Sequence, residues 1–293
     1  MEGKAQPDSI VVGVDGSAVG NLALDWAAAQ ASARGLPIHL VHAFTPDLPS
    51  FEFGAGLSVQ AIRESGKRLL VMARDRVHRV NPDLPVTGVC TSGYAAAALI
   101  RASRHAEYVV VGAHGNGAFS TTALGSVAMQ VTTHAYCPAV VVKHSDASHQ
   151  PYGRVVVGVD GSTHSLQALA SAFRQAAIRS AELLVVHAWE ARGHEDPTLG
   201  SSDWPDYERA QHSRVERALG HEQRHYPEVK VAQQVRRGRA VPILVEAARS
   251  ADLAVVGSRG LGGFPGLRIG SVCHGVLNRA ACPVMVTRSR DDD

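Results

Sequence analysis

The amino-acid sequence predicts an α/β protein made of two tandem, doubly wound domains, each built around a five-stranded parallel sheet. Three observations predict this fold class. Short β-branched segments alternate with longer helical patterns, which is typical of a parallel sheet covered by helices. The length of 293 residues accommodates two domains of ordinary size. The whole pattern also recurs at one constant spacing along the chain.

The repeat is carried by short motifs, each of which recurs 145 residues further on. The sequence VVGVDGS at residues 11–17 recurs at 156–162, and Cys137-Pro138 recurs as Cys282-Pro283. Because one spacing holds throughout, the copies have no net insertion or deletion between these motifs. A repeat of this length must be recognised before the fold is assigned.

The domain boundaries follow from the repeat and from a change in composition. Residues 143–152 are polar, lack hydrophobic periodicity and contain Pro151, which is typical of a short exposed linker. We therefore predict domain 1 at residues 1–145, a linker at 146–152 and domain 2 at 153–290.

The first elements of each copy are predicted from apolar runs and helix signals. Residues 10–15 are nearly all apolar, as expected for a strand buried on both faces. A helix rich in Ala and Leu follows over 21–34, with Ser17 able to cap its start. Gly35-Leu36-Pro37 ends that helix, and residues 38–43 form the second strand.

The later elements alternate in the same way and predict the topology. They are a long helix over 58–80, strands over 86–90, 108–112 and 139–142, a helix over 95–106 and a helix beginning near Gly125. Crossovers between parallel strands are almost always right-handed. The expected strand order is therefore 3-2-1-4-5, and ligands of such sheets bind beyond the carboxyl ends of the strands at the switch point between strands 1 and 4.

The similarity between the two copies is concentrated in two segments, and both segments lie at this switch point. One is the end of strand 1 with Asp15. The other is a glycine-rich loop that contains Gly112 and Gly115, followed after nine residues by Gly125-Ser126. Glycines let backbone N–H groups approach a ligand, and a helix start adds further N–H groups and the positive end of the helix dipole. This arrangement predicts an anion cradle suited to phosphates. The alternative interpretation is that the glycines only permit tight turns.

Two common phosphate motifs are absent from the sequence. There is no G-x-x-x-x-G-K-[ST] motif, and no G-x-G-x-x-G motif follows strand 1. Strand 2 ends in His42-Ala43 rather than in an acidic residue. These absences argue against a P-loop NTPase and against a dehydrogenase.

The pattern G-x-x-G, nine residues, G-S, together with an Asp at the end of strand 1, resembles the universal stress protein family. The chain is most similar to its tandem-domain, ATP-binding type, as found in actinobacteria, and the resemblance covers essentially the whole sequence. It implies a Rossmann-like fold of the adenine nucleotide alpha hydrolase type. It also implies an ATP-binding regulator of stress adaptation, often a homodimer, that acts on a regulatory protein partner.

The resemblance assigns roles residue by residue. It places Asp15 and Asp160 at the nucleoside end of the nucleotide, and it places the backbone of Val41 and Val186 at the adenine edge. The glycines and serines of the loop match phosphate-binding positions. The candidate nucleotide-binding residues are Gly13, Asp15, Val41, Gly112, His114, Gly115, Asn116, Gly117, Gly125, Ser126 and Val127 in the first copy, and Gly158, Asp160, Val186, Gly257, Ser258, Arg259, Gly260, Leu261, Gly262, Arg268, Gly270, Ser271 and Val272 in the second.

The two candidate sites differ in charge. The second copy carries Arg259 and Arg268, either of which can neutralise phosphate charge, where the first has His114 and Ala123. We therefore predict two ATP sites, of which the second binds more tightly, with Mg²⁺ able to accompany the phosphates.

Several alternatives remain open on the sequence. Asp15 and Asp160 can also cap the turn that follows the strand. No Ser/His/Asp or paired-carboxylate arrangement can be assembled, so any ATP hydrolysis is expected to be slow and no residue is assigned as catalytic. His42 and His187, at the ends of strands, are expected to be structural. The competing functions are a scaffold that works without nucleotide and a slow ATPase.

Composition excludes other classes of function. The net charge of +2 and the scattered Lys and Arg residues give no footprint for nucleic acid. No apolar run is long enough to span a membrane and no signal peptide is evident, so a cytoplasmic protein is expected. The histidines do not cluster at metal-ligand spacing, and the four cysteines form no C-x-x-C pair, which favours reduced structural thiols.

Overall fold

The chain divides into two compact units, Met1–Ser145 and Asp146–Asp293, which we call the first and second units. The structure is a computed structural model, and it describes residues 7–45, 59–115, 124–143, 151–190, 204–262 and 267–288. Residues 146–150 of the predicted linker lie outside the described residues.

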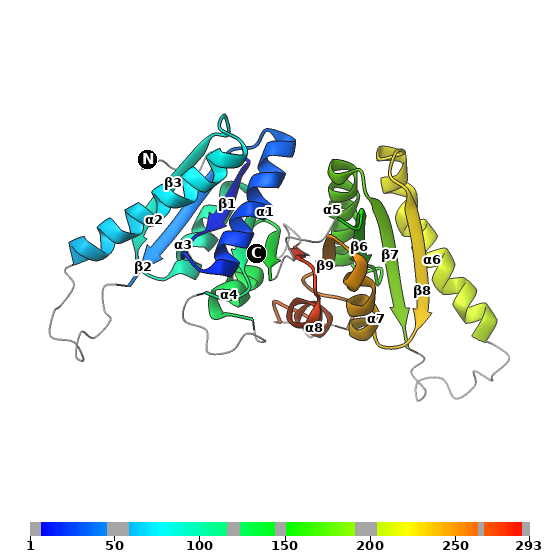
Figure 1. Cartoon of the computed structure of the whole chain (residues 1–293). Coiled ribbons are helices and arrows are strands. Elements are labelled where there is room, and N and C mark those ends of the chain that lie inside the picture. Colours follow the sequence, from blue (N-terminus) through cyan, green and yellow to red (C-terminus); the bar gives the residue numbers. More distant parts are fainter. Residues whose placement is uncertain are drawn as a thin grey trace. The chain divides into compact units, whose positions relative to one another are not determined.

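Strands and helices alternate along the first unit (Figure 1). Its elements are β1 (Ser9–Gly13), α1 (Ala18–Arg34), β2 (Ile38–Phe44), α2 (Val59–Val80), β3 (Val86–Ser92), α3 (Ala95–Ala102), a 3₁₀ turn (Ser103–His105), β4 (Ala106–Gly112), α4 (Ser126–His134) and β5 (Ala139–Val142).

The second unit repeats this order. Its elements are β6 (Arg154–Gly158), α5 (Thr163–Arg179), β7 (Glu182–Trp189), α6 (Trp204–His225), β8 (Val231–Arg237), α7 (Ala240–Ala247), a 3₁₀ turn (Ala248–Ser250), β9 (Leu253–Gly257), α8 (Ser271–Arg279) and β10 (Val284–Thr287).

All strand pairs within each unit are parallel. In the first unit the pairing order is β3-β2-β1-β4-β5, and in the second it is β8-β7-β6-β9-β10. Val12 of β1, for example, is in register with Leu40 of β2 on one side and Val110 of β4 on the other. The predicted α/β class and the strand order 3-2-1-4-5 are confirmed, with the switch point between β1 and β4.

Helices cover both faces of the sheet in each unit. In the first unit α1 packs against α2, whereas α3 packs against α4, and the second unit has the corresponding pairs α5–α6 and α7–α8. The central strands are buried on both sides, and Ile10, Val11 and Val12 are fully inaccessible to solvent. This double burial is why these strands are apolar at successive positions rather than at alternate ones.

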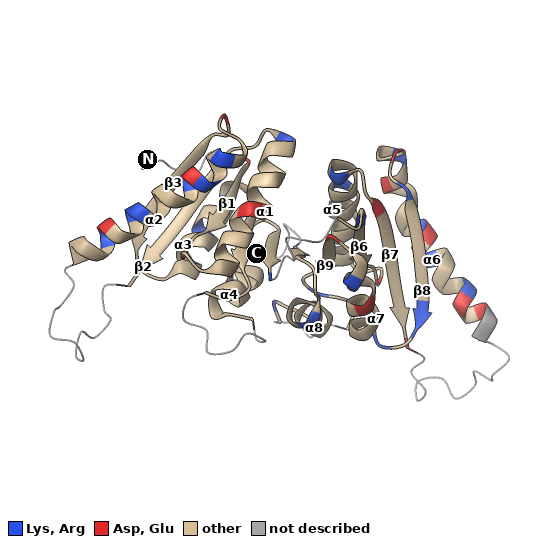
Figure 2. Cartoon of the chain, in the orientation of Figure 1, with Lys and Arg blue, Asp and Glu red and all other residues tan. Residues whose placement is uncertain are grey.

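Charged side chains lie mainly on the helices. In Figure 2, blue and red residues alternate along α2 and α6, while β1 and β2 carry none. The pair Lys67–Glu64 on α2 is exposed to solvent, whereas the apolar residues of the central strands lie in the core.

The main differences from the sequence expectation are at element ends. The first strand ends at Gly13 rather than at Asp15, because the Asp15 carboxylate accepts hydrogen bonds from the following turn. The first helix begins at Ala18 rather than at residue 21, since the Ser17 hydroxyl accepts a hydrogen bond from the Gly20 N–H, at 2.9 Å, and starts it earlier. The expected helix over 95–106 ends at Ala102 and continues as the 3₁₀ turn.

Candidate functional site

A cavity of about 390 Å³ opens at the carboxyl ends of β1 and β4 in the first unit. Its volume lies within the range of small-molecule sites, and its place is the switch point where such sheets bind ligands. The predicted residues that border it are Gly13, Asp15, Val41, Gly112, His114, Gly115, Gly125, Ser126 and Val127. Asn116 and Gly117 lie outside the described residues.

The second unit has a corresponding cavity of about 370 Å³ beyond β6 and β9. The predicted residues that border it are Gly158, Asp160, Val186, Gly257, Arg259, Gly260, Gly262, Gly270, Ser271 and Val272. Three further candidates do not border it. Ser258 is buried, Leu261 is exposed, and Arg268 is exposed with its carbonyl oxygen 3.0 Å from Arg288 Nη2.

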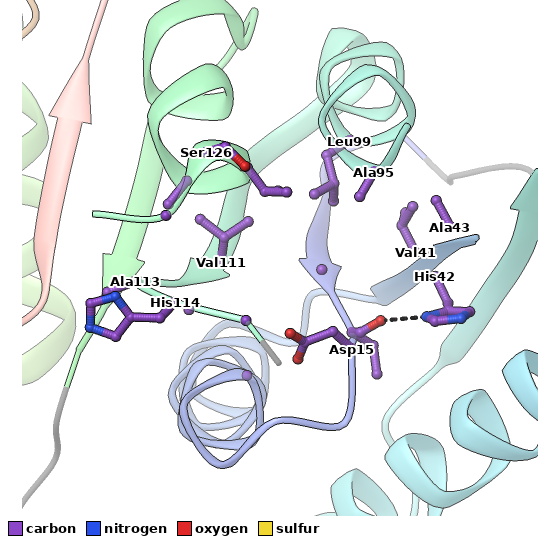
Figure 3. Close-up of a pocket in the computed structure, with 18 residues that line it drawn as sticks. Asp15, Val41, His42, Ala43, Ala95, Leu99, Val111, Ala113, His114 and Ser126 are labelled. Carbon is purple, nitrogen blue, oxygen red and sulfur yellow. Dashed lines mark hydrogen bonds between the residues drawn. The ribbon is translucent and has the colours of Figure 1, made fainter. Parts of the chain in front are cut away.

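Asp15 is held at the edge of the first cavity by its own turn. Its Oδ1 accepts hydrogen bonds from the backbone N–H of Ser17, at 3.0 Å, and from the Ser17 hydroxyl, at 2.7 Å. Asp15 therefore caps this turn, which was the alternative interpretation of this residue, and it also borders the cavity. Figure 3 shows its carboxylate on the opposite side of the cavity from Ser126. The two interpretations of this residue are compatible.

Asp160 contacts both its own turn and the glycine loop. The backbone N–H of Ser162 donates to its Oδ1 at 2.9 Å, and the N–H of Leu261 donates to its Oδ2 at 2.9 Å. Burial by itself would raise the pKa of Asp160, but hydrogen bonds from Ser162, Leu261 and Ser165 outweigh burial and hold the pKa below its ordinary value. Asp160 is therefore a carboxylate at neutral pH.

The glycine loop passes directly against the aspartate in both units. A Cβ atom at Gly115 would lie 2.6 Å from Asp15 Oδ2, and one at Gly260 would collide with Asp160 Oδ2 in the same way. A side chain at either position would displace the carboxylate, so these glycines allow the loop to approach it closely and do more than permit a turn. The Gly125 N–H donates to the Ala113 carbonyl at 2.7 Å, which returns the loop to the end of β4.

The helix after each loop begins without a side-chain cap. Gly125 precedes α4 and Gly270 precedes α8, and neither can offer a side-chain acceptor to the first-turn N–H groups. Ser126 and Ser271, the first residues of these helices, border the two cavities. An uncapped helix start at a cavity is suited to binding an anion.

An apolar wall that sequence reasoning missed faces the glycine loop. Ala95 and Leu99 of α3 border the first cavity, and Ala240 and Leu244 of α7 border the second (Figure 3 shows the first pair). The signal that would have found them was available, because Ala and Leu recur at these positions with the spacing of the repeat. Such a wall is suited to a flat apolar group such as a nucleobase.

His42 and His187 hold the ends of the second strands in place. His42 Nδ1 lies 2.8 Å from the Val14 carbonyl oxygen, as the dashed line in Figure 3 shows, and His187 Nδ1 lies 2.7 Å from that of Val159. A carbonyl oxygen only accepts, so each Nδ1 carries a proton. These contacts support the structural role expected for both histidines.

The described residues contain no other obvious chemical centre. They bring no three His, Cys, Asp or Glu side chains together in a way that would hold a metal ion. None of the described helices combines the length and apolar character needed to cross a bilayer. All four cysteines are buried and form no disulfide, as expected for reduced structural thiols.

A parallel sheet with a glycine-lined cavity at its switch point, beside an uncapped helix start, defines an α/β protein suited to small phosphorylated ligands. The universal stress protein family model matches residues 7–143 and 151–288. The chain therefore belongs to the universal stress protein family, with two such domains in tandem. The family supports a role in the stress response.

The chain is similar to several individual universal stress proteins. Universal stress protein Rv1996 of Mycobacterium tuberculosis is 34% identical over 304 residues, covering 97% of this chain and 96% of the relative. A universal stress protein structure from Archaeoglobus fulgidus has a TM-score of 0.69 at 19% identity and covers 99% of both chains, which shows the same fold. A universal stress protein in complex with cAMP is 30% identical, covers 47% of this chain and 98% of its own, and has a TM-score of 0.33.

Proposed function

We propose that this chain binds ATP at both cavities and acts as a nucleotide-dependent regulator in the stress response, with at most slow hydrolysis. The observation that carries the proposal is the recurrence of one constellation in both units. In each, a glycine loop passes against an aspartate and leads into an uncapped helix start at the edge of a cavity. Glycines that served only to form a turn would not need to border a cavity in both units.

The parts of each cavity match the parts of an adenine nucleotide. The apolar wall suits the base, and Asp15 or Asp160 is placed to accept hydrogen bonds from ribose hydroxyls. The Val41 carbonyl accepts the Val14 N–H at 2.9 Å and retains a second lone pair for the adenine edge, as does that of Val186 with Val159. The loop N–H groups and Ser126 or Ser271 then bind the phosphates, and Mg²⁺ binds through the phosphate oxygens.

The second site is proposed to bind ATP more tightly than the first. Arg259 borders the second cavity, whereas His114 borders the first at the corresponding position. A guanidinium keeps its charge at every physiological pH and can form paired hydrogen bonds to phosphate. Arg268 does not border the cavity, so Arg259 is the residue that we assign to phosphate charge.

Matched variants test both parts of this proposal by calorimetry. Gly115→Ala and Gly260→Ala each place a Cβ against the corresponding aspartate, so each variant disables one site by the same means. The wild-type chain should bind two ATP molecules and each variant one, with the smaller Kd in Gly115→Ala. Equal affinities would contradict the inequality of the sites, and the absence of binding would contradict the function.

Nucleotide carried through purification separates the competing functions. The protein is denatured, and the supernatant is analysed by anion-exchange chromatography. ATP supports a binding regulator, whereas ADP or AMP alone supports a slow ATPase. No nucleotide, together with no thermal shift on adding ATP, supports a scaffold that works by protein contacts alone.

The remaining expectations concern organisation and partners. We propose two nucleotide-binding domains at 1–145 and 153–290, with residues 146–152 as linker, in a homodimer that acts on a regulatory protein partner. The support is the resemblance to tandem universal stress proteins. Light scattering of the purified chain should give twice the mass of one chain, and the mass of one chain would contradict the dimer.

A further inference from the structure

The second unit contains a side-chain pair between the glycine loop and the start of α5. Arg259 Nε and Nη2 lie 3.3 and 3.2 Å from Nε2 of His164. A guanidinium has only N–H donors, so the imidazole nitrogen must be the acceptor in both contacts. His164 Nε2 therefore accepts from two donors of one arginine.

A close approach of the backbone places the two residues together. A Cβ atom at Gly257 would lie 2.8 Å from the carbonyl carbon and oxygen of His164, so only glycine lets the first turn of α5 lie against the end of β9. Arg259 follows Gly257 by two residues and is thereby brought within reach of the imidazole.

The two members of the pair have different positions relative to the cavity. Arg259 is among the residues that border it, whereas His164 is described by the structure but is not among them. Both residues are half-buried. His164 thus contacts the arginine without bordering the cavity itself. Holding a long side chain in one place reduces the entropy that ligand binding must remove.

The first unit lacks both members of the pair. Val19 occupies the position of His164, and His114 occupies that of Arg259. The backbone approach is nevertheless retained, because a Cβ atom at Gly112 would lie 3.1 Å from the Val19 carbonyl carbon. The scaffold is therefore common to both units, and the Arg–His pair belongs to the second alone.

We propose that His164 is a positioning residue that holds Arg259 in the wall of the second cavity, and that the pair makes this site selective for the charge of the phosphate chain. The proposal rests on the proposed function, because it assumes that the second cavity binds an adenine nucleotide. It assigns selectivity for ATP over adenosine to two side chains, of which only Arg259 touches the ligand.

A double-mutant cycle tests the pair in a chain whose first site is disabled by Gly115→Ala. In this background, calorimetry measures Kd for ATP and for adenosine with Arg259→Ala, His164→Val and both together. Arg259→Ala should raise the Kd for ATP about tenfold, because a charge-assisted hydrogen bond is lost. His164→Val introduces the residue that the first unit has at this position. It should raise the Kd for ATP about fivefold, because the Arg259 side chain is no longer held in place. The Kd for adenosine should not change in either single variant. The double variant should have the same Kd for ATP as Arg259→Ala.

His164→Gln is the conservative rescue, because its side-chain oxygen can accept from the guanidinium, and it should retain most of the ATP affinity. If His164 had only a structural role, its substitution would raise the Kd for ATP and the Kd for adenosine equally. That result, additive effects in the double variant, or tighter ATP binding in His164→Val would each overturn the proposal. Absence of ATP binding in the Gly115→Ala and Gly260→Ala proteins alike would instead overturn the proposed function, and the pair with it.

A transplant gives a second readout at the first site. In a Gly260→Ala background, Val19→His with His114→Arg should increase ATP affinity at the first site more than His114→Arg does alone. An equal gain in the two proteins would overturn the positioning role, since the added imidazole would then contribute nothing.

Discussion

Adding a side chain should have different effects at different glycines of this chain. Gly66 and Gly220, which lie in two helices of the same length, illustrate this. Gly66 of α2 is buried, and a Cβ there would lie 2.6 Å from His42 Cδ2 and 2.7 Å from Cys90 Sγ. At Gly220 of α6 the nearest atom to a Cβ would be Arg224 Nη1, at 3.9 Å. The first position is closed to a side chain, and the second is open.

We therefore expect opposite effects from one substitution. Gly66→Ala should lower the free energy of unfolding by about 1–3 kcal/mol, because the ring and the sulfur must move. Gly220→Ala should raise it by about 0.5–1 kcal/mol, because alanine favours the helix and meets no obstacle. Urea unfolding of the two variants beside the wild type measures both, and a stabilised Gly66→Ala protein would show that α2 does not pack this closely.

Asp160 should make stability depend on acidity. Its pKa in the folded chain lies below the ordinary value, so the unfolded chain takes up a proton first as the pH falls. The contribution of the carboxylate is fully present above the pKa of the unfolded state and is lost as the pH falls through the folded pKa. The difference in unfolding free energy between wild type and Asp160→Asn should therefore shrink below about pH 4. A constant difference from pH 7 to pH 3 would contradict this.

At the scale of elements, the packing of helices on the sheet determines the reactivity of the thiols. Burial raises the pKa of Cys137, just before β5, to about 12, and it raises the pKa of Cys273 on α8 to about 12 as well. Both groups are thus protonated at neutral pH, and the thiolate is the reactive form.

Alkylation should consequently report on the integrity of these elements. At pH 8, iodoacetamide should leave Cys137 and Cys273 unmodified in the native chain and should modify both in guanidinium chloride, as measured by mass spectrometry of the peptides. Rapid modification of Cys273 in the native protein, at a rate above that of unfolding, would mean that α8 opens locally.

At the scale of the whole molecule, ligand binding should stabilise the two units unequally. A ligand that binds only the folded state adds about 2.7 kcal/mol at one hundred times its Kd. At one fixed ATP concentration, the gain in unfolding free energy should be larger for Gly115→Ala, whose second site is intact, than for Gly260→Ala. Denaturant titrations with and without ATP measure both gains, and the opposite ranking would place the tighter site in the first unit.

Much of this molecule was predictable because its signals are local or repeated. Apolar runs indicated the strands, and right-handed crossovers left one favoured strand order. Ser17 was recognised as a possible cap of α1, although the helix was expected to begin three residues later than it does. The spacing of the repeat placed the glycine loops and aspartates at equivalent positions, and the sheet topology put them at one edge. Ends of elements were less accurate, because hydrogen bonds such as that from the Ser17 N–H to Asp15 decide where regular backbone stops.

By itself, the sequence determined the fold class, the strand order and the location of the candidate sites, since these depend on hydrophobic pattern and on residues that recur together. Only the tertiary structure decided which side chains meet around each cavity. The Leu261 N–H reaches Asp160 across 101 positions of chain, and Arg259 reaches His164 across 95. Contacts of that kind depend on how closely the glycine loop and the helix start approach each other, and a one-dimensional pattern does not specify that distance.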